Sequence, residues 1–209
     1  CSHDFTRPCW YVKCDMKGFF MSIPREELAD KVDAFILDKY KGYDIEDLRY
    51  LSRVTIMNDP TKNCIKRSSE ETMAKVPLGK TLRGAKKNHG LPIGNLTSQH
   101  DANFWLNDFD WMLEIILRIY YHGRYVDDFF LVHQDKRVLL ASVPKIRKYL
   151  ANIGVTLHPR KIELQSVYKG IKFTGMVVKR DRIYASNRMV SNFKQLVHHM
   201  NTLPDNYTI

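Results

Sequence analysis

The hydrophobic and polar positions of this chain predict a series of short strands. Residues 10–23, WYVKCDMKGFFMSI, form a run that predicts a buried strand leading into a turn. In residues 124–132, the segments RYV and FFLV predict two strands joined by Asp127 and Asp128, because aromatic and β-branched residues favour strands. Further short strands are expected near residues 155–157, 171–178 and 183–184.

Helices are predicted where apolar residues recur every three or four positions. Residues 24–40 begin with Pro24 and two Glu, which suit the first turn of a helix, and carry an apolar stripe from Leu28 to Ile36. Other helices are expected at residues 45–58, 96–118 and 136–152, and from Ser186 onwards. Strand, helix, hairpin, helix and strands in this order predict an α+β fold, an antiparallel sheet with helices packed on one face.

Charge and composition narrow the class of partner. The chain has 209 residues, 44% of them hydrophobic, with a net charge of +10 and a pI of about 9.4. This balance favours nucleic acid over a membrane as the partner. No apolar run approaches the roughly 20 residues that span a bilayer, and the N-terminal residues lack the apolar core of a signal peptide. Because the chain starts at Cys1 and ends in a polar stretch, we expect a piece of a longer protein.

Residues 61–90 contain eight Lys or Arg and two Glu, with little periodicity. The segment is either a solvated loop or a surface that follows phosphates, and the overall charge favours the second interpretation. The cysteines, Cys1, Cys9, Cys14 and Cys64, include no C-x-x-C pair. A zinc site that uses His3 with Cys9 and Cys14 is an alternative, but its spacing matches no usual framework, so we expect reduced, structural thiols.

Three acidic residues are the candidates for chemistry. Asp127 and Asp128 alone favour a hairpin turn over a metal site, because Asp tolerates the positive φ of tight turns. Asp15 lies at the end of a buried strand, where it either pairs with Lys13 or Lys17 or binds a cation. In a ferredoxin-like sheet the first strand lies beside the central hairpin, so all three carboxylates could converge. Divalent cations would offset their repulsion, and such a cluster suits nucleotidyl transfer.

Five motifs in order then resemble reverse transcriptases. They are KCDMKGFFMSI at 13–23, GLPIGNLTSQ at 90–99, YVDD at 125–128, GVTLHPRK at 154–161 and KGIKFTG at 169–175. The resemblance implies a polymerase palm, an RRM-like antiparallel sheet with part of the fingers. It also implies RNA-directed DNA polymerisation with an RNA template, a DNA or RNA primer and dNTPs, and no membrane partner.

The middle motif narrows the subgroup. Ile93-Gly94 followed by Ser98-Gln99 is similar to the reverse transcriptases of bacterial diversity-generating retroelements. Retron, group II intron and abortive-infection enzymes remain alternatives. The subgroup resemblance implies a cytoplasmic protein of a bacterium or phage, copying that is error-prone at template adenines, and a basic accessory protein as a partner.

The resemblance also assigns roles to single residues. Asp15 and Asp127 resemble the principal ligands of two Mg²⁺ ions, for which Mn²⁺ can substitute. Asp128 is the third acid, and Met16 follows Asp15 in the metal site. Lys161 resembles the residue that protonates or neutralises pyrophosphate; a solvated lysine is the alternative.

Substrate contacts follow from the same motifs. Phe19 and Phe20 lie at the nucleotide, and Phe20 resembles the steric gate that excludes a ribose 2′-OH, with core packing as the alternative. Ile93 and Gly94 would face the incoming base and sugar, unless they form only a turn. The expected template and primer contacts, for which a helix cap and an ordinary hairpin are the alternatives, are Ser98, Gln99, Phe173, Thr174 and Gly175.

The expected division of the chain is palm at 1–42, a basic fingers-side segment at 43–89, palm again at 90–185, and the start of a truncated thumb at 186–209. Reverse transcriptases usually carry a finger region before the first motif, and few residues precede Asp15 here. We therefore expect that region to be missing or never present, and we expect weak or undetectable polymerisation by this fragment. The alternative function is a catalytically inactive palm that binds nucleic acid.

Overall fold

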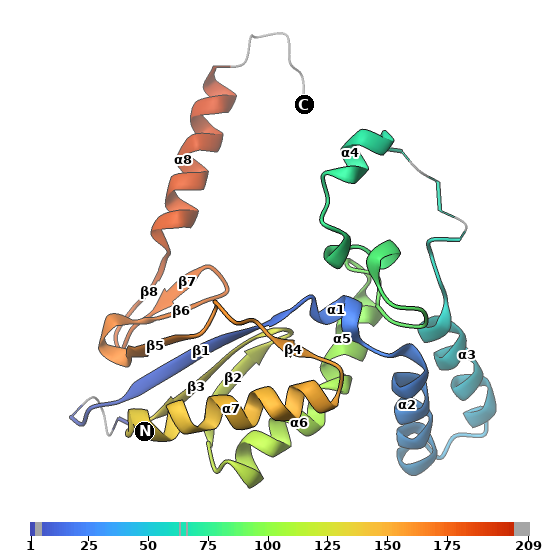
Figure 1. Cartoon of the computed structure of the whole chain (residues 1–209), viewed down its shortest axis with the longest axis horizontal. Helices are drawn as coiled ribbons and strands as arrows, with labels where there is room; N and C mark the ends of the chain where they lie inside the picture. Colours follow the sequence, from blue (N-terminus) through green and yellow to red (C-terminus); the bar gives the residue numbers. More distant parts are fainter. Residues whose placement is uncertain (3–5, 63, 66, 203–209) are drawn as a thin grey trace.

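An antiparallel sheet forms the centre of the molecule (Figure 1). The structure is a computed structural model, which describes residues 1–2, 6–62, 64–65 and 67–202. The strand order is β2-β3-β1-β4, and β5 also pairs with β1. The strands are β1 (Trp10–Lys17), β2 (Tyr121–Tyr125), β3 (Asp128–His133), β4 (Thr156–Leu157) and β5 (Glu163–Ser166).

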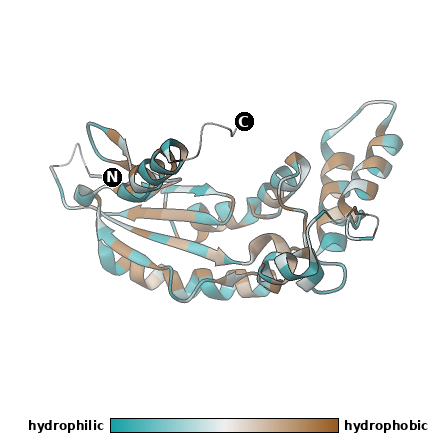
Figure 2. Ribbon diagram, turned by 90° about the horizontal axis from the view of Figure 1, so that it is seen from above, coloured by the Kyte–Doolittle hydropathy of each residue, from teal (hydrophilic) through white to brown (hydrophobic). Residues whose placement is uncertain are grey.

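Helices cover one face of this sheet and form the core with it. They are α5 (Leu96–Trp105), α6 (Asn107–Trp111), the π-helical segment η3 (Met112–Ile116) and α7 (Lys136–Asn152). Alternate residues of β1, Val12, Cys14 and Met16, are buried in this core. Figure 2 shows hydrophobic stretches, in brown, and hydrophilic stretches, in teal, on the strands and on the helices that cover them. Lys13 and Asp15 therefore lie on the opposite face.

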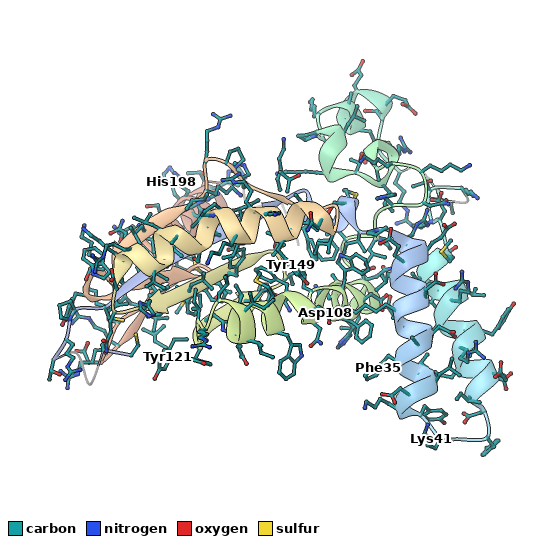
Figure 3. All side chains as sticks on the ribbon, turned by 60° about the horizontal axis from the view of Figure 1, so that its bottom comes forward. Phe35, Lys41, Asp108, Tyr121, Tyr149 and His198 are labelled. Carbon is teal, nitrogen blue, oxygen red and sulfur yellow. The ribbon has the colours of Figure 1, made fainter. Side chains whose placement is uncertain are left out.

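A helical hairpin docks beside the sheet. It follows the short helix α1 (Phe19–Ser22) and consists of α2 (Arg25–Lys39) and α3 (Ile45–Met57). Lys31 Nζ lies 2.9 Å from an Asp108 carboxylate oxygen, and the Phe35 ring packs edge-on against Phe104 at 5.2 Å. Figure 3 labels Phe35 and Asp108 at this junction, and Tyr149 where α7 packs against Phe109 of α6.

Two outlying parts extend from the same side of the sheet (Figure 1). One is the basic segment, the stretch within residues 61–90 that contains α4 (Glu70–Ala74) and the 3-10 turns η1 (Leu78–Lys80) and η2 (Leu82–Gly84). The other begins with the 3-10 turn η4 (Val167–Lys169) and continues into a three-stranded sheet of β6 (Ile171–Phe173), β7 (Met176–Val178) and β8 (Ile183–Ala185). It ends in α8 (Asn187–Asn201), which buries no residue.

The predicted α+β architecture is confirmed, with three local corrections. In residues 10–23, which predicted a strand leading into a turn, the strand ends at Lys17, Gly18 adopts a φ of +58°, and the short helix α1 follows. The single helix expected at 96–118 is interrupted at Leu106, before Asn107 and Asp108, which favour helix starts over helix interiors. The strand β5 was not predicted, since its sequence ELQS has little strand character.

Candidate active site

The three predicted acids meet at one end of the main sheet. In the register of β1 and β3, Asp15 lies directly opposite Asp128, and directly opposed residues share a face. Asp128 also pairs with Tyr125 of β2, so that Val126 and Asp127 form the two-residue turn between β2 and β3. The Met16 backbone N–H donates to the Asp127 carbonyl oxygen at 3.1 Å, which ties this turn to β1.

Val126, and neither aspartate, adopts the unusual backbone conformation of this turn. Its φ is +56°, a region that β-branched residues rarely enter, whereas neither Asp127 nor Asp128 has a positive φ. The expectation that aspartate supplies the positive φ is therefore wrong. The Val126 side chain is buried, and this burial offsets the local strain of the turn.

Arg124 joins the turn to the helices that cover the sheet. Its guanidinium forms a bidentate pair with Asp110 of α6, with Nε 2.9 Å from Oδ1, and Nη1 donates to Asn103 Oδ1 at 2.8 Å. The same Nη1 donates to the Val126 carbonyl oxygen at 3.3 Å. A single nearly buried side chain therefore connects the turn to α5 and α6.

Two lysines neutralise the opposed acids. Lys161 Nζ lies 2.8 Å from Asp15 Oδ2, and Lys13 Nζ lies 3.0 Å from Asp128 Oδ2. Asp15 thus pairs with Lys161 rather than with Lys13 or Lys17, the partners considered from sequence. The hydrogen bond from Lys161 to Asp15, together with the negative charges of the three acids, raises the pKa of Lys161.

Asp127 differs from the other two acids. Burial raises the pKa of its carboxyl group, and the nearby charges of Asp15 and Asp128 raise it further. Among the described residues, no group of three His, Cys, Asp or Glu side chains is placed to hold a metal ion as it stands. The donors are nevertheless carboxylate oxygens, the chemistry that Mg²⁺ prefers, and two of the three carboxylates are turned towards lysines.

A pocket of about 400 Å³ opens at Asp15 and Asp128. Its lining consists of Lys13, Asp15, Asp128, Arg160, Lys161, Ile162 and Glu163. Sequence reasoning assigned neither Lys13 nor Arg160 to the site. The period of two along β1, which puts Lys13 on the same face as Asp15, is the signal that could have identified Lys13. The Met16 side chain is in the core, so only its backbone could take part in the site.

The predicted nucleotide-side motifs are joined by backbone hydrogen bonds. The Leu91 backbone N–H donates to the Phe20 carbonyl oxygen at 2.9 Å, so the motif at residues 90–99 lies beside the motif at residues 13–23. Phe20, for which core packing was the alternative, is half-buried at the edge of the core, whereas the Phe19 side chain is fully buried within the core. Ile93 is exposed, and Gly94 has a φ of +102° with open space where a Cβ would stand.

The predicted template and primer residues fall into two places. Asn95 is the N-cap residue of α5, so the alternative that Ser98 and Gln99 cap this helix is wrong. Ser98 is buried and Gln99 is exposed. On the primer side, Phe173 packs edge-on against Phe130 of β3 at 4.9 Å. Thr174 and Gly175, both with positive φ, form the turn between β6 and β7.

The basic segment lines a second pocket, of about 380 Å³, between α2, α3 and residues 82–89. Its cationic lining consists of Arg25, Lys62, Lys86 and Lys87, with His89 beside them and Asp59 as the one acid in the lining. The Arg25 side chain is buried and donates to the carbonyl oxygens of Met57 and Asn58 at 3.2 and 3.0 Å. This positive concavity is consistent with a surface that contacts phosphates.

The four cysteines are free thiols, as expected. Cys14 lies in the core, where burial raises its pKa to about 12, which does not suit a zinc ligand. His3, the other residue of the alternative zinc site, lies outside the described residues. No helix within the described part of the chain is long and apolar enough to cross a membrane.

Comparisons with known proteins identify the family and the fold. The model of the family "Reverse transcriptase (RNA-dependent DNA polymerase)" matches residues 2–178. A search of curated protein sequences found no match.

Solved telomerase structures from Candida tropicalis share the fold. The apo enzyme truncated from its C-terminal domain has a TM-score of 0.58 at 14% identity and aligns over 86% of this chain and 36% of its own. The complex with the TWJ fragment of telomeric RNA gives 0.54 at 16% identity over 92% and 34%, and the apo enzyme gives 0.53 at 15% over 88% and 34%. This chain therefore spans about a third of the length of those proteins.

The acid-bearing hairpin, the ordered motifs around it and the family match over residues 2–178 lead to one assignment. This chain belongs to the reverse transcriptase (RNA-dependent DNA polymerase) family.

Proposed function

We propose that this chain forms the catalytic palm of an RNA-directed DNA polymerase, which adds dNTPs to a primer 3′-OH on an RNA template. The observation that carries the proposal is the register of β1 and β3, which sets Asp15 directly opposite Asp128 with Asp127 in the adjoining turn. Three carboxylates at one edge of a basic protein suit nucleotidyl transfer.

Asp15 and Asp127 would hold two Mg²⁺ ions, or Mn²⁺ in their place, with Asp128 as the third acid and the Met16 backbone beside them. When bound, such ions activate the attacking hydroxyl and stabilise the pyrophosphate leaving group. Lys161 places an ammonium group at this site, where it can neutralise or protonate pyrophosphate. Arg160, which lines the same pocket, adds positive charge for a triphosphate.

The remaining roles concern selection and positioning. Phe20 acts as the steric gate against a 2′-OH, and Ile93 and Gly94 receive the base and sugar, where the absent Cβ of Gly94 leaves room. Ser98 and Gln99 lie on the template side, and residues 173–175 support the primer end. We expect Phe20→Val to admit ribonucleotides, which would appear as a lower dNTP-to-rNTP ratio of incorporation.

The proposed division assigns residues 1–42 and 90–185 to the palm, 43–89 to the fingers side and 186–209 to the start of a thumb. From the middle motif we further propose a bacterial or phage diversity-generating retroelement, a cytoplasmic location and an accessory protein as partner. Retron, group II intron and abortive-infection types are the alternatives. Sequencing of the products separates them, because misincorporation concentrated at template adenines supports the first type and uniform fidelity contradicts it.

The decisive experiment measures Mg²⁺-dependent dNTP incorporation on a primed RNA template. The protein is expressed from its complete reading frame and compared with Asp127→Asn and with Asp181→Asn, an exposed acid outside the site. We expect Asp127→Asn to abolish incorporation and Asp181→Asn to retain it. Incorporation that survives Asp127→Asn would refute the catalytic assignment. The 209-residue chain alone is expected to show weak or undetectable extension.

A catalytically inactive palm that binds nucleic acid is the second candidate, and one observation favours it. Lys13 and Lys161 already neutralise two of the acids, so the cluster does not need a metal ion to persist in the folded protein. An inactive palm would bind a primer–template duplex and show no incorporation by the complete protein with either Mg²⁺ or Mn²⁺.

A further inference from the structure

The two lysines at the acid cluster are held in different ways. Lys13 extends from the central strand β1, and its side chain is only 23% exposed. Lys161 extends from the connection between β4 and β5, and its side chain is 58% exposed. The first lysine is therefore fixed by the sheet, whereas the second lies at the solvent boundary.

Lys13 also contacts an aromatic ring. Its Nζ lies 5.8 Å from the centroid of the Phe173 ring, within the range of a cation–π interaction. Phe173 in turn packs against Phe130, which is the cross-strand partner of Lys13. The ammonium group is thus placed between the Asp128 carboxylate and an aromatic ring from the β6–β7 hairpin.

The two lysines form ion pairs with different acids, Lys13 with Asp128 and Lys161 with Asp15. Lys13 supplies one positive charge for Asp128, its ion-pair partner. If Lys161 leaves, the carboxylates of Asp15 and Asp127 have no lysine partner and can bind a divalent cation. Displacing Lys161 costs one hydrogen-bonded pair near the surface, whereas displacing Lys13 would also break its contact with Phe173.

We propose that Lys13 is a positioning residue that stays paired with Asp128, whereas Lys161 is a temporary counter-ion that leaves Asp15 when a divalent cation binds. This inference rests on the proposed function. Lys13 also contacts Phe173, whose ring packs on Phe130 of β3, so Lys13 and Phe130 together hold the β6–β7 turn, which would support a primer end, near the acids.

Amine labelling tests the displacement. The 209-residue chain is pulse-acetylated with and without Mn²⁺, and the modification of each lysine is quantified by mass spectrometry. We expect Mn²⁺ to increase the labelling of Lys161 several-fold and to leave Lys13 unchanged. Lys148, exposed on α7, serves as the internal reference. In Asp15→Asn, Lys161 should label rapidly without Mn²⁺, and Mn²⁺ should have no further effect.

Mn²⁺ binding is measured in the same samples by electron paramagnetic resonance. Bound Mn²⁺ with no increase at Lys161, or with an equal increase at Lys13, overturns this inference and leaves the proposed function standing. If no Mn²⁺ binds, the metal-dependent part of the proposed function fails, and this inference fails with it.

Hydrogen exchange tests the positioning role of Lys13. We expect Lys13→Met to accelerate amide exchange in residues 171–178 and Lys13→Arg to restore slow exchange, because arginine keeps the charge and the stacking capacity. Lys17→Met removes an exposed lysine from the same strand and should change nothing there. Equal exchange in Lys13→Met, Lys17→Met and the unmodified chain would overturn the role.

Discussion

Arg124 gives the sharpest test of how the acid-bearing turn is supported. Its side chain is 9% exposed, and its guanidinium bonds Asp110, Asn103 and the carbonyl oxygen of Val126. Arg124→Met keeps most of the apolar stem and removes every one of these hydrogen bonds. The carboxylate of Asp110 then loses its partner while it remains partly buried.

The magnitude follows from the exposure of the pair. Removing one partner of a fully buried ion pair costs about 3–5 kcal/mol. Because Asp110 is 32% exposed and water can reach it, we expect a smaller loss, about 2–3 kcal/mol of unfolding free energy. For a chain of this size, this corresponds to a decrease in melting temperature of roughly 4–12 °C.

Urea denaturation followed by circular dichroism measures the loss. The double variant Arg124→Met/Asp110→Leu should recover part of it, since it removes the unpaired charge as well. Arg137→Met, which removes an arginine from an exposed pair with Asp135, is the matched control and should leave the melting temperature unchanged. A loss below about 0.5 kcal/mol for Arg124→Met, or strictly additive effects of the two substitutions, would refute the reasoning.

Three further predictions follow from single positions. A Cβ on Gly123 would lie 2.7 Å from the ring of Phe130. We therefore expect Gly123→Ala to lower the free energy of unfolding, measured by urea denaturation, by about 1–3 kcal/mol. An unchanged free energy of unfolding would contradict this placement of the ring. Burial raises the pKa of Cys14 to about 12, whereas Cys64 is exposed. At mildly alkaline pH, a thiol reagent should therefore modify Cys64 quickly and Cys14 only after unfolding. Equal rates of modification would contradict the burial of Cys14. The raised pKa of Asp127 means that its carboxyl group binds a proton more tightly in the folded state than in the unfolded state. As the pH increases through that pKa, the free energy of unfolding of the metal-free protein should therefore fall and the affinity for Mn²⁺ should rise. Calorimetric titrations that give a Mn²⁺ affinity independent of pH would contradict this prediction.

The sequence alone determined the α+β class, most helices and the identity of the acids. The stripe from Leu28 to Ile36 is a local pattern, because it depends only on which side chains can face a common core. The helix over residues 136–152 was likewise predicted at its observed bounds. The break at Leu106 was missed although Asn107 and Asp108, which favour helix starts, follow it in the sequence.

Only the tertiary structure decided how the acids are paired. Asp15 and Asp128 are far apart in sequence, and their opposition depends on the register between β1 and β3. That Lys161 pairs with Asp15 and Lys13 with Asp128 depends on where the β4–β5 connection and the β6–β7 hairpin pack. The positive φ of Val126 likewise requires the burial and the Arg124 hydrogen bond that offset it. Such long-range contacts are set by packing, which no local pattern encodes.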